Sequence, residues 1–214
     1  GTRQEPDSAT RKKPRARIAL VTGGTRGIGR AIRLELKEAG ARVVTNYVAN
    51  DAAANAFKDE SAIEVFKFEV GDFDACKDGI SKVEADIGPI DILVNNAGMS
   101  PLYGSLVEVS EELWDKVQAV NLKGPFRLSA LIGTRMAEGE GGSIINRSSV
   151  LGLRSGSAFE SAPYSASKGG ILALTTTMAV EHGRDNVRVN AIVPGYLYTP
   201  MVAGSMTEEQ RDLR

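Results

Sequence analysis

The stretch Thr22-Gly23-Gly24-Thr25-Arg26-Gly27-Ile28-Gly29 decides the fold of this chain. It joins a short apolar run, Ile18-Ala19-Leu20-Val21, to a segment whose apolar residues recur at helical spacing as far as Ala39. Glycine allows backbone conformations and close approaches that a Cβ atom would block, and the N-terminus of a helix attracts phosphate. The stretch therefore predicts a strand, a phosphate-binding turn and a helix, although ordinary strand–helix turns also use glycine.

Strand-like and helical patterns alternate along the rest of the chain. We expect strands near residues 18–21, 43–48, 65–68, 90–94, 143–145 and 187–193, and helices near residues 28–39, 51–58, 72–87, 111–136 and 163–183. The longest helix should be interrupted or bent near Gly124-Pro125, because proline removes a helical hydrogen bond. Strands that are apolar on both faces predict an α/β fold, a doubly wound parallel sheet of order 3-2-1-4-5-6 in a Rossmann-like α/β/α sandwich. Ligands of such folds bind at the carboxyl ends of the strands.

The 214 residues fit one domain, which we place at residues 17–214. Residues 1–16 carry five basic side chains and no large apolar one, a composition that predicts a disordered tail. The alternative for this tail is an arm that binds nucleic acid or a partner.

Composition narrows the function classes. A net charge of -1 does not point to nucleic acid, and no apolar run is long enough to cross a bilayer. A single cysteine, Cys76, cannot form an internal disulfide, which is typical of a cytoplasmic protein. We expect no metal, because no group of His, Cys, Asp and Glu has the spacing of metal ligands.

Two further patterns fall near expected strand ends. Asn95-Asn96-Ala97-Gly98 follows the fourth strand, where small residues would let a cofactor lie against the backbone, although a simple turn has the same composition. Tyr164 and Lys168 are four residues apart and share one face of a helix. An ammonium group near a phenol favours the phenolate, which makes the tyrosine a better acid–base group. Taken alone, this spacing is that of an ordinary surface pair.

Together these residues resemble the short-chain dehydrogenase/reductase family over residues 17–201. The motifs that carry the resemblance stand in the family's order: 22–29, 95–98, Asn121, Ser148-Ser149, Tyr164 to Lys168, and Pro194-Gly195. The resemblance implies an enzyme that transfers hydride between nicotinamide and a carbonyl or secondary alcohol. Within the family, the chain looks like the reductases of 3-oxoacyl-(carrier protein) and acetoacetyl-CoA.

The resemblance implies catalytic roles for Asn121, Ser149, Tyr164 and Lys168. Tyr164 would be the general acid in reduction and the base in oxidation, and Lys168 would promote its ionisation and hold the nicotinamide ribose. Asn121 would position a water molecule in a proton relay behind Lys168. Ser149 would hydrogen-bond the substrate oxygen.

Ser148 is the alternative to Ser149, because the interval between Ser149 and Tyr164 is about two residues longer than the family commonly has. We therefore expect an extra bulge beside the substrate, within residues 154–162.

The choice of cofactor follows from the charges near the end of the second strand. An acidic residue there would bind the adenosine ribose hydroxyls, but Thr45-Asn46-Tyr47 contains none and the next acid is Asp51. Arg26 suits a 2′-phosphate instead, unless it is only a solvated surface charge. NADP(H) is therefore favoured over NAD(H). The cofactor-binding residues implied by the resemblance are Gly23, Thr25, Arg26, Gly27, Ile28, Gly29, Asn46, Tyr47, Glu69, Val70, Asn95, Ala97, Gly98, Tyr164, Lys168, Pro194, Gly195 and Thr199.

The substrate stays open at this point. Arg127 matches one basic position with which the carrier-protein reductases dock the carrier, whereas Val180 stands at the other. An apolar loop would suit a hydrophobic ketone, alcohol or sugar-derived substrate equally well. Its residues are Met99, Leu102, Tyr103, Leu151, Leu153 and Phe159.

The chain ends soon after the sixth expected strand, so we expect the family's usual last strand to be lacking. The resemblance also implies a homodimer or homotetramer, built through the helices that start near Glu111 and Pro163. The alternative to an enzyme is a cofactor-binding protein of the same family that is catalytically silent. That alternative predicts nucleotide binding without hydride transfer.

Overall fold

The computed structural model describes residues 16–49, 51–101, 103–154, 162–197 and 199. The expected tail, except for Ala16, lies outside the described residues. So do Leu102, Phe159, most of the expected bulge before Tyr164 and everything beyond residue 199.

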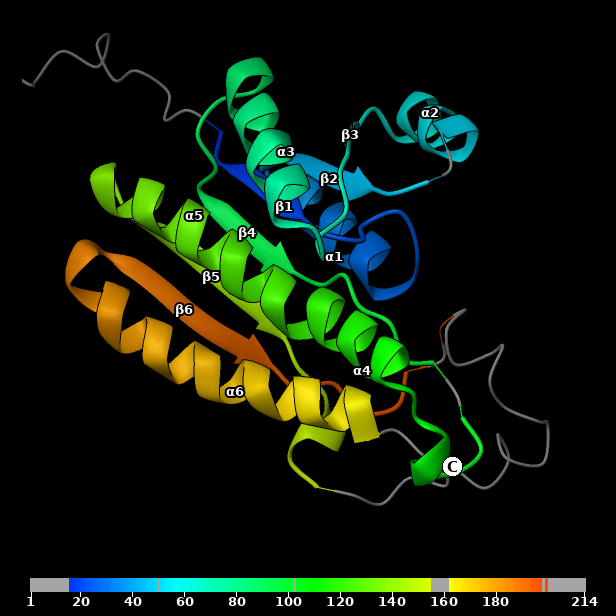
Figure 1. The fold of residues 1–214 in the computed structure, drawn as a ribbon. Helices are drawn as coiled ribbons and strands as arrows, with labels where there is room; N and C mark the ends of the chain where they lie inside the picture. The colour runs from blue at the N-terminus through cyan, green and yellow to red at the C-terminus, as the bar shows by residue number, and fades with distance from the viewer. Residues whose placement is uncertain (1–15, 50, 102, 155–161, 198, 200–214) are drawn as a thin grey trace, which may run out of the picture.

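Six parallel strands form one sheet in the order β3-β2-β1-β4-β5-β6, as the sequence predicted. Their bounds are β1 Ile18–Val21, β2 Arg42–Tyr47, β3 Glu64–Lys67, β4 Ile92–Asn95, β5 Gly142–Arg147 and β6 Val187–Ile192. Val21 at the end of β1 pairs with Thr45 of β2 on one side and Val94 of β4 on the other. The carboxyl ends of the strands therefore meet along one edge, to which the arrowheads point in Figure 1.

The helices agree with the predicted pattern. They are α1 Gly27–Glu38, α2 Asp51–Ser61, α3 Phe73–Asp86, α4 Glu111–Gln118, α5 Gly124–Glu138 and α6 Ala162–His182, with short 3-10 turns η2 Leu106–Glu108, η4 Val150–Gly152 and η5 Gly183–Asp185. The helix predicted over residues 111–136 is interrupted, as the sequence allowed, by a π-helical turn, η3 Ala119–Lys123, which ends directly before Gly124-Pro125. Pro125 then stands in the first turn of α5, where its missing N–H costs nothing.

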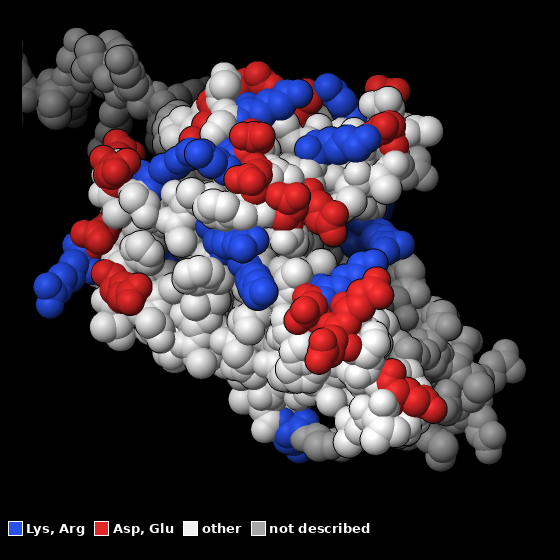
Figure 2. All heavy atoms as spheres, in the orientation of Figure 1, with Lys and Arg blue, Asp and Glu red and all other residues white. Residues whose placement is uncertain are grey.

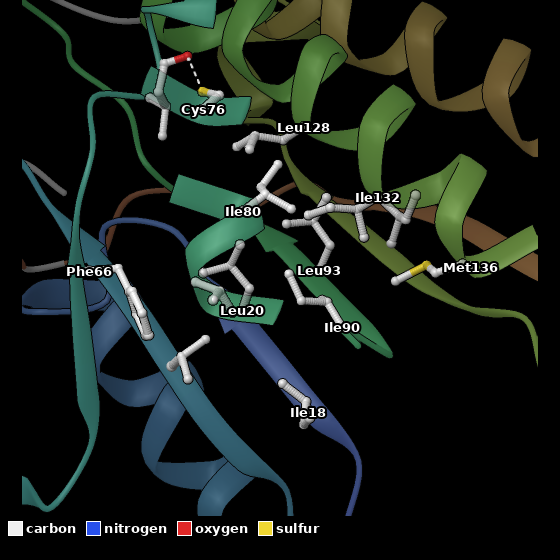
Figure 3. Packing of buried hydrophobic residues seen from close by; sticks show 14 of the residues in the cluster. Ile18, Leu20, Phe66, Cys76, Ile80, Ile90, Leu93, Leu128, Ile132 and Met136 are labelled. Carbon is white, nitrogen blue, oxygen red and sulfur yellow. Dashed lines mark hydrogen bonds between the residues drawn. The ribbon is translucent and has the colours of Figure 1, made fainter. Parts of the chain in front are cut away.

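Helices cover both faces of the sheet. On one face, α3, α5 and α6 pack against β1, β2, β4 and β5, and in Figure 3 Leu20, Leu93, Ile80 and Leu128 point toward one another across this layer. On the other face, Ile32 and Leu36 of α1 pack against Ala19 and Val21. Burial raises the pKa of the Cys76 thiol to about 11, so this side chain behaves as part of the core.

The surface carries charges of both signs. Figure 2 shows Lys and Arg interspersed with Asp and Glu on the viewed face, with no continuous basic patch there. Among the described residues, no helix is long and apolar enough to cross a membrane. The same residues contain no group of three or more His, Cys, Asp and Glu side chains placed to hold a metal ion.

The glycine turn after β1 is packed against the start of the segment that follows β4. Gly23 and Gly27 have φ of 64° and 54°, in the left-handed region that favours glycine. A Cβ atom on Gly29 would collide with the side-chain amide of Asn96 and with the carbonyl oxygen of Gly23. The turn is therefore fixed by close contacts as well as by its own backbone.

We predict that Gly29→Ala lowers the free energy of unfolding by about 1–3 kcal/mol, because the added methyl group overpacks the contact between the turn and Asn96. The matched control is Gly183→Ala, where an added Cβ meets nothing within 4 Å and little change is expected. Urea unfolding of both variants measures the difference. Equal stability of the two variants would contradict the prediction, because it would show that the turn and Asn96 can shift to make room for the added methyl group at little cost in free energy.

Candidate active site

A cleft of about 800 Å³ runs along the carboxyl ends of the strands. It is lined by the glycine turn and the N-terminus of α1, by residues after β2 and β3, and by the segment after β4. The predicted cofactor-binding residues that line it are Gly23, Thr25, Arg26, Gly27, Ile28, Gly29, Asn46, Tyr47, Glu69, Val70, Ala97, Gly98 and Thr199. Most of the predicted set is therefore brought to one place.

Some predicted residues take other positions. Asn95 is buried and its amide nitrogen donates to Ser129 Oγ at 2.9 Å and to Asn146 Oδ1 at 2.8 Å, so its side chain ties β4 to α5 and β5. The Pro194 carbonyl, next to Gly195, accepts a hydrogen bond from Val150 N at 3.1 Å. Asn95, Pro194, Gly195, Tyr164 and Lys168 are not among the residues that line the cleft.

Asn46 lines the cleft but also has a structural task. Its Oδ1 accepts from Gly23 N at 2.9 Å, and its Nδ2 donates to the Phe68 carbonyl at 2.9 Å. Thr45 acts beside it, since its hydroxyl accepts from Gly24 N and donates to the Val21 carbonyl. The end of β2 thus holds the glycine turn in shape.

Three polar side chains converge on Gly98 at the catalytic end of the cleft. A Cβ atom placed on Gly98 would lie 3.2 Å from Asn121 Oδ1, 3.3 Å from Arg147 Nη2 and 3.7 Å from Lys168 Nζ. These side chains come from η3, β5 and α6, which are far apart in the sequence. A side chain at residue 98 would be in tight contact with Asn121 and Arg147.

Lys168 is almost completely buried. Its ammonium group donates to the Arg147 carbonyl at 2.8 Å and lies 5.5 Å from the centre of the Tyr164 ring. Burial, and then the charge of Arg147, lower the pKa of Lys168 to about 7. The predicted Tyr164–Lys168 pair is thus a pair in space, not two separate surface side chains.

Asn121 links the loop after β4 to the tyrosine helix. It lies in the π-helical turn η3, a type of turn that often occurs at functional sites. Its Oδ1 accepts from Met99 N at 2.9 Å, and its Nδ2 donates to the Met99 carbonyl at 2.8 Å and to Ser167 Oγ at 3.2 Å. The Ser167 hydroxyl in turn donates to the Tyr164 carbonyl. The water-positioning role of Asn121 stays a prediction.

The two candidate serines differ in their bonding. Ser148 is buried and its hydroxyl donates to the Lys168 carbonyl at 2.7 Å, which uses its only proton. Ser149 Oγ accepts from Leu151 N at 3.2 Å at the start of η4, so its proton can be given to another acceptor. This difference favours Ser149 as the substrate-binding hydroxyl.

The residues of the cleft fit a dinucleotide. Gly27, Ile28 and Gly29 line it at the N-terminus of α1, and the N-cap residue Arg26 makes no side-chain capping hydrogen bond there. The first backbone N–H groups of α1 can therefore bind a pyrophosphate. The fit rests on these N–H groups and on glycines that line the cleft at the start of the helix.

Sequence reasoning missed Arg147 and Asn96. Arg147 lines the cleft and is the last residue of β5. A charged residue directly after the run Ser143-Ile144-Ile145-Asn146 could have pointed to a functional role. Asn96 donates to the carbonyl oxygens of Thr22 and Gly23. No pattern distinguishes it from Asn95 beforehand.

A doubly wound parallel sheet whose first strand ends in a glycine turn is the architecture of dinucleotide-binding proteins. The model of the short chain dehydrogenase family matches residues 17–210. The chain belongs to this family and is an enzyme, an oxidoreductase of a class that uses a nicotinamide cofactor.

Relatives of known activity cover most of the chain. The acetoacetyl-CoA reductase of Rhizobium meliloti is 45% identical over 187 residues, which are 87% of this chain and 76% of that protein. The 3-oxoacyl-[acyl-carrier-protein] reductase of Thermotoga maritima is 36% identical, over 86% and 76% of the two chains. The structure of a gluconate 5-dehydrogenase from Burkholderia cenocepacia, in complex with NADP and tartrate, is 33% identical with a TM-score of 0.82, covering 92% of this chain and 78% of that one.

We predict that the buried ammonium group of Lys168 makes stability depend on pH. Because its pKa is lowered to about 7, the unfolded chain binds more protons than the folded one from about pH 7 to about pH 10. The free energy of unfolding of the wild type, relative to Lys168→Met, should therefore rise with pH in this window by up to about 1.4 kcal/mol per pH unit.

Urea unfolding of both proteins at pH 7, 8 and 9 measures this difference. Lys82→Met, at an exposed lysine of α3, is the control, and its curve should run parallel to that of the wild type. A constant difference between wild type and Lys168→Met would contradict the prediction.

Proposed function

We propose that the chain is an NADP(H)-dependent oxidoreductase that transfers hydride between nicotinamide and a carbonyl or secondary alcohol, with Tyr164 as the general acid and base. The observation that carries the proposal is that Tyr164 and buried Lys168 lie together on α6, with Lys168 Nζ next to Gly98, a residue that lines the cleft. When bound, the cofactor supplies the hydride. The chain must supply the proton, the orientation and the exclusion of water.

Each side chain at this end has a task. The Tyr164 hydroxyl gives its proton to the carbonyl oxygen in reduction and takes it back in oxidation. Lys168, held by the Arg147 carbonyl, stabilises the resulting phenolate. Ser149 donates its hydroxyl proton to the same substrate oxygen. An anionic dinucleotide in the cleft favours the charged form of Lys168, so binding prepares the site for proton transfer.

Two positioning contacts support this role for Tyr164. The backbone N–H of Ala162 donates to the Tyr103 hydroxyl, and the side-chain amide of Gln118 donates to the Pro163 carbonyl, each at 2.9 Å or less. Both contacts hold the first turn of α6, which carries the tyrosine. The loop after β4 and helix α4 therefore fix the reacting hydroxyl relative to the cleft.

The charges around the adenosine end support NADP(H). Arg26 lines the cleft, whereas Asp51 is outside its lining and pairs with Lys67 at 2.9 Å. Hydrogen bonds from Lys67 and then Tyr47 lower the pKa of Asp51, so this acid is engaged on the surface. A 2′-phosphate beside Arg26 would therefore not face Asp51, although Glu69 after β3 also lines the cleft. The gluconate 5-dehydrogenase structure that the chain resembles contains NADP.

For the substrate we propose a 3-oxoacyl thioester, with acetoacetyl-CoA as the first to try. The similarity to acetoacetyl-CoA reductases, at 44–45% identity, supports this choice.

The homodimer or homotetramer expected from the sequence stays a prediction. Phe126 and Val180, exposed on α5 and α6, are side chains that such an interface would bury, and light scattering would measure the mass.

We predict that Tyr164→Phe lowers the rate of ketone reduction by at least about 100-fold, because the proton donor is lost while the ring remains. The measurement is NADPH oxidation at saturating acetoacetyl-CoA, followed by absorbance. NADPH binding, titrated separately by fluorescence, should stay within about twofold of the wild type and serves as the control. Comparable turnover by wild type and variant would rule out Tyr164 as the general acid.

We predict that Arg26→Ala weakens NADPH binding by about tenfold or more and leaves NADH binding nearly unchanged, because only NADPH carries the 2′-phosphate. Arg30→Ala, at an exposed arginine one turn further along α1 that does not line the cleft, is the matched control. Fluorescence titration gives all the dissociation constants. If both cofactors lost affinity equally, Arg26 would not contact the 2′-phosphate.

A further inference from the structure

Arg147 is a cation at the catalytic end of the cleft. It is the last residue of β5, two residues before Ser149, and its side chain lines the cleft. Its Nη2 lies close to the space above Gly98, which Asn121 Oδ1 and Lys168 Nζ also border. The guanidinium group is thus placed among the side chains that the proposed reaction uses.

Among the described residues this charge has no carboxylate partner, and the Tyr164 hydroxyl is the acidic group whose ionised form would act on it. The Nε of Arg147 is buried and has no hydrogen-bond partner, and within the described ranges no carboxylate pairs with Arg147 or with Lys168. Glu69, an acid that lines the same cleft, follows β3, which β2, β1 and β4 separate from β5. Burial accordingly lowers the pKa of Arg147 below its usual value.

An unpaired, partly buried arginine beside a buried lysine destabilises the folded chain. Desolvation costs several kcal/mol per ion, and two like charges at short distance repel each other. The side chain of Arg147 makes no hydrogen bond that holds described elements together, so a structural role does not offset this cost. An uncompensated desolvation cost of this kind, in a side chain that lines a cleft, is typical of a charged group that pairs with a ligand.

We propose that Arg147 binds an anionic oxygen group at the catalytic end of the cleft, beside Lys168. The planar guanidinium group suits carboxylate and phosphate oxygens equally. Two ligands could supply that group: the carboxylate of an oxo-acid substrate, or a phosphate of the dinucleotide. The assignment to a substrate carboxylate rests on the proposed hydride transfer and would make an oxo-acid the substrate in place of the thioester, whereas the assignment to a phosphate rests only on the cleft.

The experiment compares Arg147→Met, which keeps the length without the charge, with Arg147→Lys, which keeps a charge. One arm titrates NADPH against the full chain without substrate. The other arm uses calorimetry to measure acetoacetate binding in saturating NADP⁺, with ethyl acetoacetate as the matched ligand that lacks the carboxylate. Neither arm needs turnover, so a failure of the proposed reaction would leave both readable.

We expect Arg147→Met to weaken the binding of one of the two ligands by about tenfold or more, and Arg147→Lys to retain much of the wild-type affinity for that ligand. A loss for NADPH identifies a cofactor phosphate. A loss of affinity for acetoacetate, without a loss of affinity for ethyl acetoacetate, identifies a substrate carboxylate as the group that Arg147 binds. Dissociation constants within twofold of the wild type in both arms would overturn the proposal.

The stability of the variant without ligand gives a second readout. Removal of an unpaired buried charge should leave Arg147→Met as stable as the wild type or more stable in urea unfolding. A clear loss of stability in Arg147→Met, together with dissociation constants of Arg147→Met within twofold of the wild type for both ligands, would show that Arg147 serves the fold instead.

Discussion

The side chain of Thr22 holds the carboxyl edge of the sheet together at the point where the strand order reverses. Its hydroxyl donates to the Val94 carbonyl and accepts from the backbone N–H groups of Asn96 and Ala97, both at 3.0 Å. Asn96 completes the contact by donating to the Thr22 and Gly23 carbonyls. Because β1 and β4 lead to opposite halves of the sheet, this contact places the glycine turn of one half against the catalytic segment of the other.

The catalytic end is built from charges that are costly without a ligand. Lys168 is buried with its nitrogen on a backbone carbonyl, and Arg147 stands beside it without a carboxylate partner in the described part of the chain. A dinucleotide brings several negative charges into this cleft, so the fold and the cofactor are electrostatically complementary. On this view the stability that these charges cost is recovered when the cofactor binds.

Most of the fold could be predicted from the sequence, because the signals that set it are local. The apolar run 18–21, the glycine turn and the alternation of strand and helix depend on neighbouring residues, and they yield the observed strand order. Features that depend on distant contacts could not be predicted. Spacing does not say that Asn95 turns to Ser129 while Asn96 holds the glycine turn. Nor does it reveal that the Ser148 hydroxyl donates its proton to the Lys168 carbonyl, or that the interruption before Pro125 takes the form of a π-helical turn that contains Asn121.

The central claim is that this cleft directs hydride from a nicotinamide to a ketone. The most direct measurement incubates the chain with acetoacetyl-CoA and NADPH that carries deuterium on one face of nicotinamide C4, with the opposite face labelled in a parallel sample. Mass spectrometry then locates the label in the product. The account predicts one deuteron on the new carbinol carbon in only one of the two samples. An alcohol without deuterium in both samples, or no alcohol despite bound NADPH, would contradict it.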